Sequence, residues 1–131
     1  MEYLRQCLLD THVLLWWLNG DKVSKAVHDV LSYGDCHVYV SSISALELAT
    51  KHRLGKLPQA ADVVAVYHER LFEQGFSHLS VTTQHALMAG AFPQPHGDPF
   101  DRLLAAQSLC DDLPVLSRDP ALDAFGIRRI W

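Results

Sequence analysis

The sequence has 131 residues, of which 49% are hydrophobic and 20% are charged. This length suits one domain and is too short for two ordinary ones, and the composition excludes a disordered chain. The net charge of −4 argues against a protein that coats nucleic acid by bulk electrostatics. We therefore expect a single folded domain over residues 1–131.

The negative charge is concentrated in one segment. Residues 96–123 contain six acidic and two basic residues, whereas the rest of the chain contains equal numbers of each. The six acids are Asp98, Asp101, Asp111, Asp112, Asp119 and Asp123. A local excess of this kind is compatible with a protein that acts on nucleic acid at a metal site.

Cysteine usage and hydropathy bear on the compartment. Cys7, Cys36 and Cys110 are odd in number and form no Cys-x-x-Cys pair, which argues against a disulfide framework and a thiolate zinc site. No apolar run approaches the roughly 20 residues of a membrane helix, and the first residues lack the layout of a signal peptide. We expect a cytoplasmic protein with no membrane partner.

Hydrophobic runs and turn signals predict alternating strands and helices. We expect strands at residues 7–9, 37–40, 114–116 and 127–130, with a weaker one at 79–81. We expect helices at residues 23–33, 44–54, 59–73, 83–91 and 98–110, and a buried helix face around 14–18. The last helix is expected to bury a stripe of Leu103, Ala106, Gln107 and Cys110. The alternation indicates an α/β sandwich with a mostly parallel sheet.

Acidic residues follow the ends of several predicted strands. Asp10 directly follows the first strand, and Asp119 comes shortly after residues 114–116. Glu47 lies in the first turns of the helix after the second strand, and Asp98 and Asp101 open the helix over 98–110. Because the sites of open α/β sheets form beyond the carboxyl ends of the strands, these five side chains are candidates for one site.

Each acid also has a purely structural interpretation. Asp10 could end its strand and cap the next helix, and Ser44 with Glu47 fits a capping box. Asp98 and Asp119 each precede a proline, which is typical of a helix N-cap. Asp101 lies inside a first helical turn, where only the helix dipole would favour it.

A cluster of these carboxylates would instead form a metal site. Carboxylates gathered at one edge repel one another unless a cation binds there, and oxygen ligands suit Mg²⁺ or Mn²⁺. Such an ion binds phosphate oxygens and lowers the pKa of a water molecule, which is the equipment for phosphodiester hydrolysis.

Four motifs, in order and covering nearly the whole chain, resemble those of PIN-domain ribonucleases, and most closely the toxin subunits of VapBC-type toxin–antitoxin modules. The motifs are residues 8–16 (LLDTHVLLW), 41–48 (SSISALEL), 96–107 (HGDPFDRLLAAQ) and 116–119 (LSRD). The resemblance implies a PIN-like three-layer α/β/α sandwich with a central sheet of four or five strands. It also implies an endoribonuclease that uses one or two Mg²⁺ or Mn²⁺ ions, an antitoxin that blocks its site, and a homodimer. No sequence-specific DNA binding by the chain alone is expected.

The resemblance also implies roles for individual residues. Asp10 and Asp101 would be the main metal ligands, and Glu47 and Asp119 would complete the shell or position the water. Thr11 and Ser117 could bond the carboxylates or a substrate phosphate, and Asp98 stays open between a helix cap and a supporting role.

The basic residues near these motifs have two interpretations each. Arg118 could contact phosphate or pair with an acid. Lys51, Arg53 and Lys56 form the only basic cluster, which is either a solvated helix end or a contact for the RNA backbone.

Three other functions fit parts of the pattern. A haloacid-dehalogenase-like phosphatase would need a second aspartate two residues after Asp10, where His12 stands. A receiver-type phosphoryl-transfer domain would need paired acids after the first strand, and the pair Asp111–Asp112 lies at a helix end instead. A non-catalytic PIN-like binding domain would not need all four acids.

Overall fold

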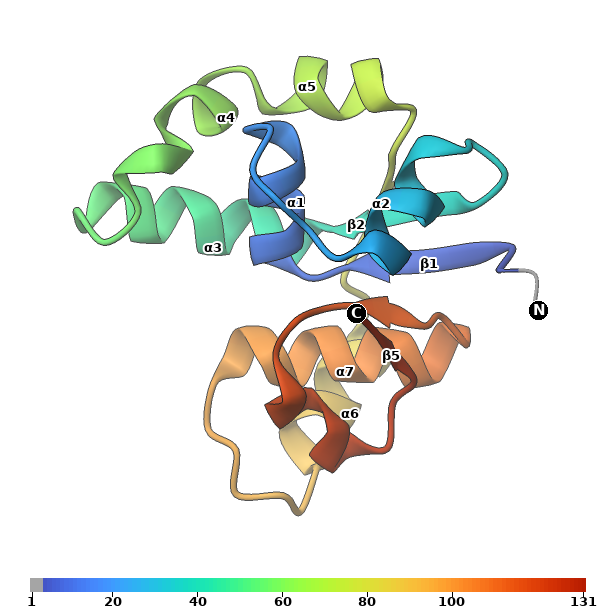
Figure 1. Cartoon of the computed structure of the whole chain (residues 1–131). Helices are drawn as coiled ribbons and strands as arrows, with labels where there is room; N and C mark the ends of the chain where they lie inside the picture. Colours follow the sequence, from blue (N-terminus) through green and yellow to red (C-terminus); the bar gives the residue numbers. More distant parts are fainter. Residues whose placement is uncertain (1–3) are drawn as a thin grey trace.

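A five-stranded, entirely parallel sheet forms the centre of the molecule (Figure 1). The computed structural model describes residues 4–131, so the first three residues of the predicted domain lie outside the described part. The strands are β1 (Gln6–Leu9), β2 (His37–Ser41), β3 (Ser77–Leu79), β4 (Val115–Leu116) and β5 (Arg129–Ile130). Their order across the sheet is β3-β2-β1-β4-β5, which confirms the predicted α/β class with a parallel sheet.

Helices cover both faces of this sheet. They are α1 (Thr11–Leu18), α2 (Lys25–Ser32), α3 (Ser42–Arg53), α4 (Ala61–Ala65), α5 (Tyr67–Gln74), α6 (Thr83–Ala91) and α7 (Pro99–Asp111), with 3₁₀ helices η1 (Pro58–Ala60) and η2 (Pro120–Phe125). In Figure 1 the first helices of the chain lie above the sheet, and α6, α7 and η2 lie below it. The fold is therefore the expected three-layer α/β/α sandwich.

The alternation of side chains along β1 builds a separate hydrophobic core on each face. Cys7 and Leu9 belong to the larger core with residues of α1, α2, α4 and α5, whereas Leu8 packs with α7 and η2. Successive strand residues point to opposite faces, so a strand covered on both sides is apolar throughout. This explains why β1 is a continuous hydrophobic run.

The prediction of one helix over residues 59–73 is wrong, because the structure has three pieces there. Val66 has φ −131° and ψ 43°, which is not helical, and it separates α4 from α5. The segment around it contains β-branched Val63, Val64 and Val66, which lower helix propensity.

Other elements differ from prediction mainly at their ends. Helix α3 starts at Ser42 rather than Ser44, since the hydroxyl of Ser41 accepts a hydrogen bond from the Ile43 amide at 3.1 Å. Strand β3 lies two residues before the predicted 79–81, and β5 covers only half of 127–130. Helix α7 packs on the sheet and on α6, so residues 104–108 are buried, while Leu103 and Cys110 are only half-buried.

The strand order places a topological switch at the centre of the sheet. From β1 the chain builds outward through β2 and β3, and it then returns to add β4 and β5 on the other side. At such a switch the connections leave in opposite directions and open a crevice beyond the carboxyl ends of the strands. Asp10 follows β1 and Ser117 follows β4, so both lie at this crevice.

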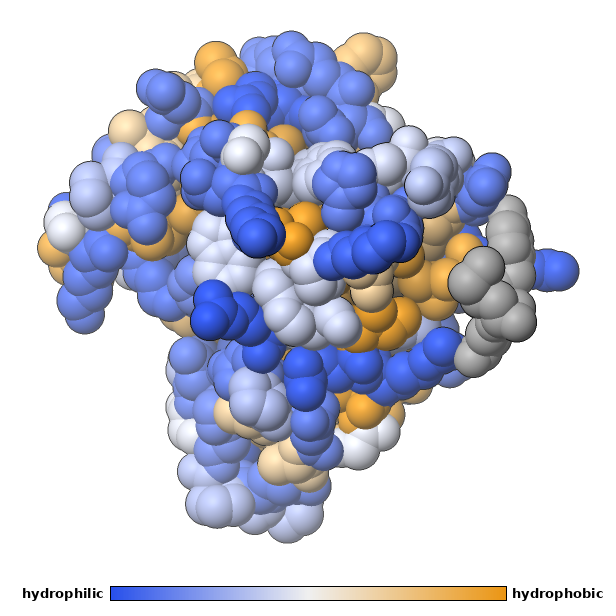
Figure 2. Space-filling view, viewed as in Figure 1, coloured by the Kyte–Doolittle hydropathy of each residue, from blue (hydrophilic) through white to orange (hydrophobic). Residues whose placement is uncertain are grey.

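The outer surface is mostly polar on the face that Figure 2 shows, where hydrophobic areas are small and separate. No helix among residues 4–131 combines the length and the apolar character that crossing a membrane would require.

Candidate active site

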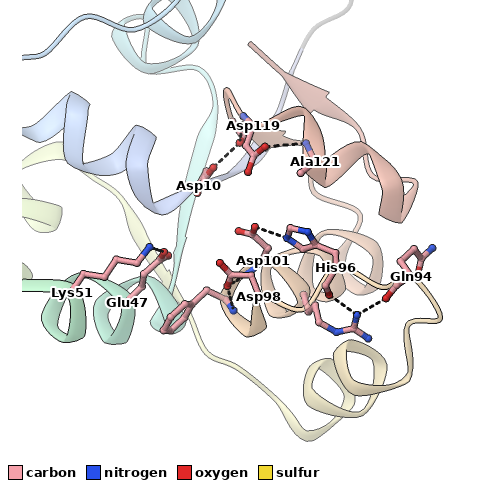
Figure 3. A network of polar contacts seen from close by, with 12 residues as sticks. Asp10, Glu47, Lys51, Gln94, His96, Asp98, Asp101, Asp119 and Ala121 are labelled. Atoms are coloured by element: carbon pink, nitrogen blue, oxygen red, sulfur yellow. Dashed lines mark hydrogen bonds and ion pairs between the residues drawn. The ribbon is translucent and has the colours of Figure 1, made fainter. Parts of the chain in front are cut away.

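A cavity of about 410 Å³ opens at the carboxyl ends of β1 and β4. Its lining contains five acidic side chains, which come from four segments far apart in the sequence: Asp10, Glu47, Asp98, Asp101 and Asp119. Figure 3 shows these carboxylates around a common space, with Glu47 and Lys51 on one side and His96 on the other. The structure thus brings together all four acids that the sequence motifs singled out, together with Asp98.

Asp10 is held at the floor of the cavity by a neighbouring strand. It occupies the N-cap position of α1, but its side chain makes no capping bond. Instead, the buried Ser117 hydroxyl donates to its Oδ2 at 2.6 Å, and the same hydroxyl accepts from the Asp119 amide at 3.0 Å. Burial raises the pKa of Asp10; the bond from Ser117 opposes this rise, and the charge of Glu47 adds to it.

Glu47 projects from the second turn of α3 and pairs with a lysine. Lys51 Nζ lies 2.5 Å from its Oε2, one turn further along the helix. The predicted capping box of Ser44 and Glu47 does not form. Ser44 lies inside the helix, and its hydroxyl is hydrogen-bonded to the Thr11 hydroxyl at 2.8 Å. Burial lowers the pKa of Lys51, but Glu47 and then Asp98 and Asp101 raise it on balance, which keeps the ammonium charged in this acidic cavity.

The first turn of α7 supplies the next two acids. Asp98 is the predicted N-cap: its Oδ1 accepts from the amides of Phe100 at 2.8 Å and Asp101 at 3.3 Å. Asp101 Oδ2 lies 2.8 Å from His96 Nε2. Burial raises the pKa of Asp101, the bond with His96 opposes the rise, and the charges of Asp98 and Asp10 add to it.

Asp119 and Arg118 complete the lining from the segment after β4. Asp119 caps η2 as predicted, with its Oδ1 accepting from the Ala121 amide at 3.0 Å. Arg118 is exposed, and within residues 4–131 it makes no hydrogen bond or ion pair. The cavity therefore contains one guanidinium that no carboxylate of the described chain neutralises.

The donor set fits a hard divalent cation. Five carboxylates supply only oxygen ligands, and the raised pKa values of Asp10 and Asp101 reflect negative charge held out of water without a full counter-charge. Among the described residues, however, no three acidic, histidine or cysteine side chains are grouped tightly enough to hold an ion. Each acid has its own partner instead: Asp10 bonds Ser117, Glu47 bonds Lys51, Asp101 bonds His96, and Asp98 and Asp119 cap helices.

Arg102 is a supporting residue that the sequence analysis did not identify. Its guanidinium donates to four backbone carbonyls, one near the end of α6 and three in the loop that follows it, at 2.7 to 2.9 Å. The acceptors are Ala89, Phe92, Gln94 and His96. A loop rich in proline has few backbone N–H donors, so its carbonyls need donors from elsewhere. The arginine in the adjacent helix was the one sequence feature that could have indicated this contact.

The remaining predicted site residues lie at the periphery. Thr11 is buried beneath the cavity, where its bond to Ser44 ties α1 to α3. Arg53 and Lys56 are exposed near the end of α3 and are absent from the cavity lining, unlike Lys51. His12 and Trp16 do line the cavity, although the apolar run around Trp16 predicts mainly a core residue.

The chain is similar to one family and to several solved structures. The family model of the PIN domain matches residues 7–127. VapBC2 from Rickettsia felis, bound to a DNA fragment from its promoter, has a TM-score of 0.68 at 12% identity, over 95% of this chain and 97% of that one. DNA-bound VapBC from Salmonella typhimurium has a TM-score of 0.66 at 20% identity, over 98% of both chains. FitAcB from Neisseria gonorrhoeae has a TM-score of 0.63 at 22% identity, over 95% and 96%. The comparison with curated proteins gives no match.

Proposed function

Because this chain belongs to the PIN domain family, we propose that it is a metal-dependent endoribonuclease and the toxin subunit of a type II toxin–antitoxin module. One observation supports this proposal above the others. Four segments that are distant in the sequence direct Asp10, Glu47, Asp101 and Asp119 into one cavity, although capping alone would not require them to converge.

Mg²⁺ or Mn²⁺, as one or two ions, is the cofactor that these oxygen ligands fit. Asp10 and Asp101 are the proposed main ligands, and Glu47 and Asp119 complete the shell or orient the attacking water. The bound ion would supply Lewis-acid activation of that water and neutralise charge on the phosphate. Ser117 binds one oxygen of Asp10, and a cation would bind the other oxygen.

The basic side chains would hold the RNA backbone. Arg118 has a free guanidinium in the cavity, and Lys51 lies 2.5 Å from Glu47 on the opposite side. Both cations would contact phosphate oxygens beside the cleaved bond. Arg53 ends the same helix and Lys56 lies just after it, where both would meet phosphates further along the RNA strand.

The proposed partners follow from the solved relatives. The similar solved structures include VapBC2 and VapBC, which carry the name of the toxin–antitoxin modules that the motifs resemble, and we propose that a cognate antitoxin covers the cavity of this chain. We further propose a homodimer that acts in the cytoplasm. Without a cation the acidic cavity should repel RNA, so metal is expected to strengthen RNA binding as well as cleavage.

Sequencing of RNA ends tests the proposal directly. Purified protein is incubated with total RNA, with and without Mg²⁺ or Mn²⁺, and the new ends are mapped. We expect internal cuts with 5′-phosphate ends that depend on metal, and at least a hundredfold loss of rate in Asp10→Asn and Asp101→Asn. Cleavage that survives in both variants, or that persists in a chelator, would rule out this mechanism.

A further inference from the structure

Three aromatic rings from the two ends of the chain lie in a row beside the acidic cavity. His12 and Trp16 are one turn apart on α1, with ring centroids 6.1 Å apart and ring planes tilted by 42°. Trp131, which follows β5, meets Trp16 edge-on at a centroid distance of 6.0 Å. In an edge-on contact the edge of one ring meets the face of the other, so these rings do not cover each other as a parallel stack does.

The sheet topology explains why the rings and the acids share one edge. Strand β5 runs parallel to β4, and β4 runs parallel to β1, so Trp131 leaves the sheet at the edge where Asp10 and Asp119 also emerge. His12 and Trp16 line the same cavity as those acids and as Arg118. Around the C-terminal end of the chain, Figure 2 shows groups of intermediate hydropathy that border hydrophilic groups on some sides and hydrophobic groups on others.

The neighbouring Trp17 is half-buried like Trp16, but it has a different set of contacts. The indole nitrogen of Trp17 donates to Gln74 at 2.9 Å, and its ring packs edge-on against His28. Trp17 therefore fastens α1 to α5 and α2, and it does not line the acidic cavity. Trp16 and Trp131 have no such polar partner among residues 4–131, and Trp131 is 37% exposed.

We propose that Trp16 and Trp131, with His12 at their side, stack an unpaired nucleobase next to the phosphate that is cleaved. The inference rests on the proposed function and names its substrate class as single-stranded RNA. If a phosphodiester lies between the acids and Arg118, the base of the same nucleotide lies next to Trp16 and Trp131. Indole faces bind any base by stacking, but only a base that has left its duplex can reach them.

A double-mutant cycle between ring and base tests this proposal without any need for cleavage. All proteins keep the native acids of the cavity, and binding is measured in Mg²⁺ by the fluorescence anisotropy of a labelled six-nucleotide RNA whose phosphodiester linkages are replaced by uncleavable analogues. The RNA is used intact, with a single abasic position moved along it, and as a blunt duplex. We expect Trp131→Ala to weaken binding of the intact strand about tenfold, in the range of one stacked base.

The losses of affinity from removing one RNA base and from removing the Trp131 ring should not add up. At one position the abasic RNA should bind the parent about tenfold more weakly, and Trp131→Ala should cause no further loss with that RNA. Trp131→Phe should recover most of the affinity, and the duplex should bind more weakly than the single strand. Trp16→Leu, which keeps apolar contact with the core, should repeat the result of Trp131→Ala.

Phe72→Ala is the matched control, because Phe72 is an aromatic side chain 85% exposed on α5 and outside the cavity. It should change affinity less than twofold. Equal losses for intact and abasic RNA, equal binding of duplex, or no measurable binding would overturn the proposal. So would ring variants that keep RNA affinity but release a co-expressed antitoxin, since the rings would then belong to the protein interface. Metal-dependent cleavage without coupling would refute the base site alone, and coupling without cleavage would refute the nuclease alone.

Discussion

Two cavities of nearly equal volume lie at opposite ends of the sheet. The cavity at the carboxyl ends measures about 410 Å³, and the one at the amino ends of β1, β4 and β5 about 420 Å³. The second is lined by apolar and uncharged polar residues together with Arg5, Asp112 and Arg128, whose charges nearly balance. The first contains five acids against the two cations Lys51 and Arg118, and two of the acids have raised pKa values. The two cavities therefore differ in charge and not in size. Within residues 4–131, only the cavity at the carboxyl ends holds buried acids without an equal number of cations.

The largest expected effect is stabilisation by metal at one end only. At a free Mg²⁺ or Mn²⁺ concentration a hundred times the Kd, binding to the folded state adds about 2.7 kcal/mol. For a chain of this length the Tm should rise by roughly 10 °C. Calorimetry should show this rise in the native protein and none in Asp101→Asn.

Asp112→Asn is the control at the amino-end cavity. Asp112 is exposed with φ 53°, a conformation that asparagine tolerates well, so this variant should gain the same Tm from metal. If both variants lose the gain, or both keep it, the carboxyl end is not where the cation binds.

The next effect compares two buried serines. Ser117 donates to Asp10 at the carboxyl end, and Ser108 donates to the Leu113 carbonyl at 2.6 Å beside the amino-end cavity. Ser117→Ala should lower RNA cleavage by about 10- to 100-fold, because groups that orient a metal ligand usually have effects of that size.

Ser108→Ala should lower stability by about 1 kcal/mol and leave cleavage within twofold. Cleavage rates and urea unfolding of the two variants separate these outcomes. Equal activity in both would mean that the orientation of Asp10 is unimportant.

The sequence predicts this site better than it predicts the helices around it. Acids after strand ends can be located because parallel strands share an edge, so the convergence of Asp10, Glu47 and Asp119 follows from topology, whereas the place of Asp101 at the start of α7 depends on the resemblance to the PIN motifs. Only the β-branched residues around Val66 indicated the break there, and they lower helix propensity without fixing where a helix stops. Loop contacts were equally hidden, because the four carbonyl bonds of Arg102 join residues that no local pattern connects.

A third prediction concerns the metal-free protein and pH. Burial raises the pKa values of Asp10 and Asp101 in the folded state. Between the ordinary and the raised pKa the folded state therefore binds more protons than the unfolded chain, so stability falls as pH rises through that range. Asp10→Asn should increase the free energy of unfolding at pH 7 by about 1 kcal/mol in a chelator.

Denaturant titrations at pH 7 and pH 4 measure that gain, which should shrink at the lower pH because the native carboxyl is then protonated. The exposed Asp112→Asn should show no such gain. A destabilised Asp10→Asn protein would mean that the Ser117 bond outweighs the cost of the buried charge.

The smallest effect separates the two roles of Asp98, which both caps α7 and lines the carboxyl-end cavity. Asparagine and aspartate cap helices about equally well, whereas alanine at an N-cap costs about 1 kcal/mol. Asp98→Ala should therefore lose about 1 kcal/mol in urea unfolding, and Asp98→Asn should match the native protein. If Asp98 is only a cap, Asp98→Asn keeps the full rise in Tm on adding metal. If its charge also helps to bind the cation, Asp98→Asn keeps its stability without metal but shows a smaller rise in Tm on adding metal. Asp98 would then both cap α7 and take part in binding the cation.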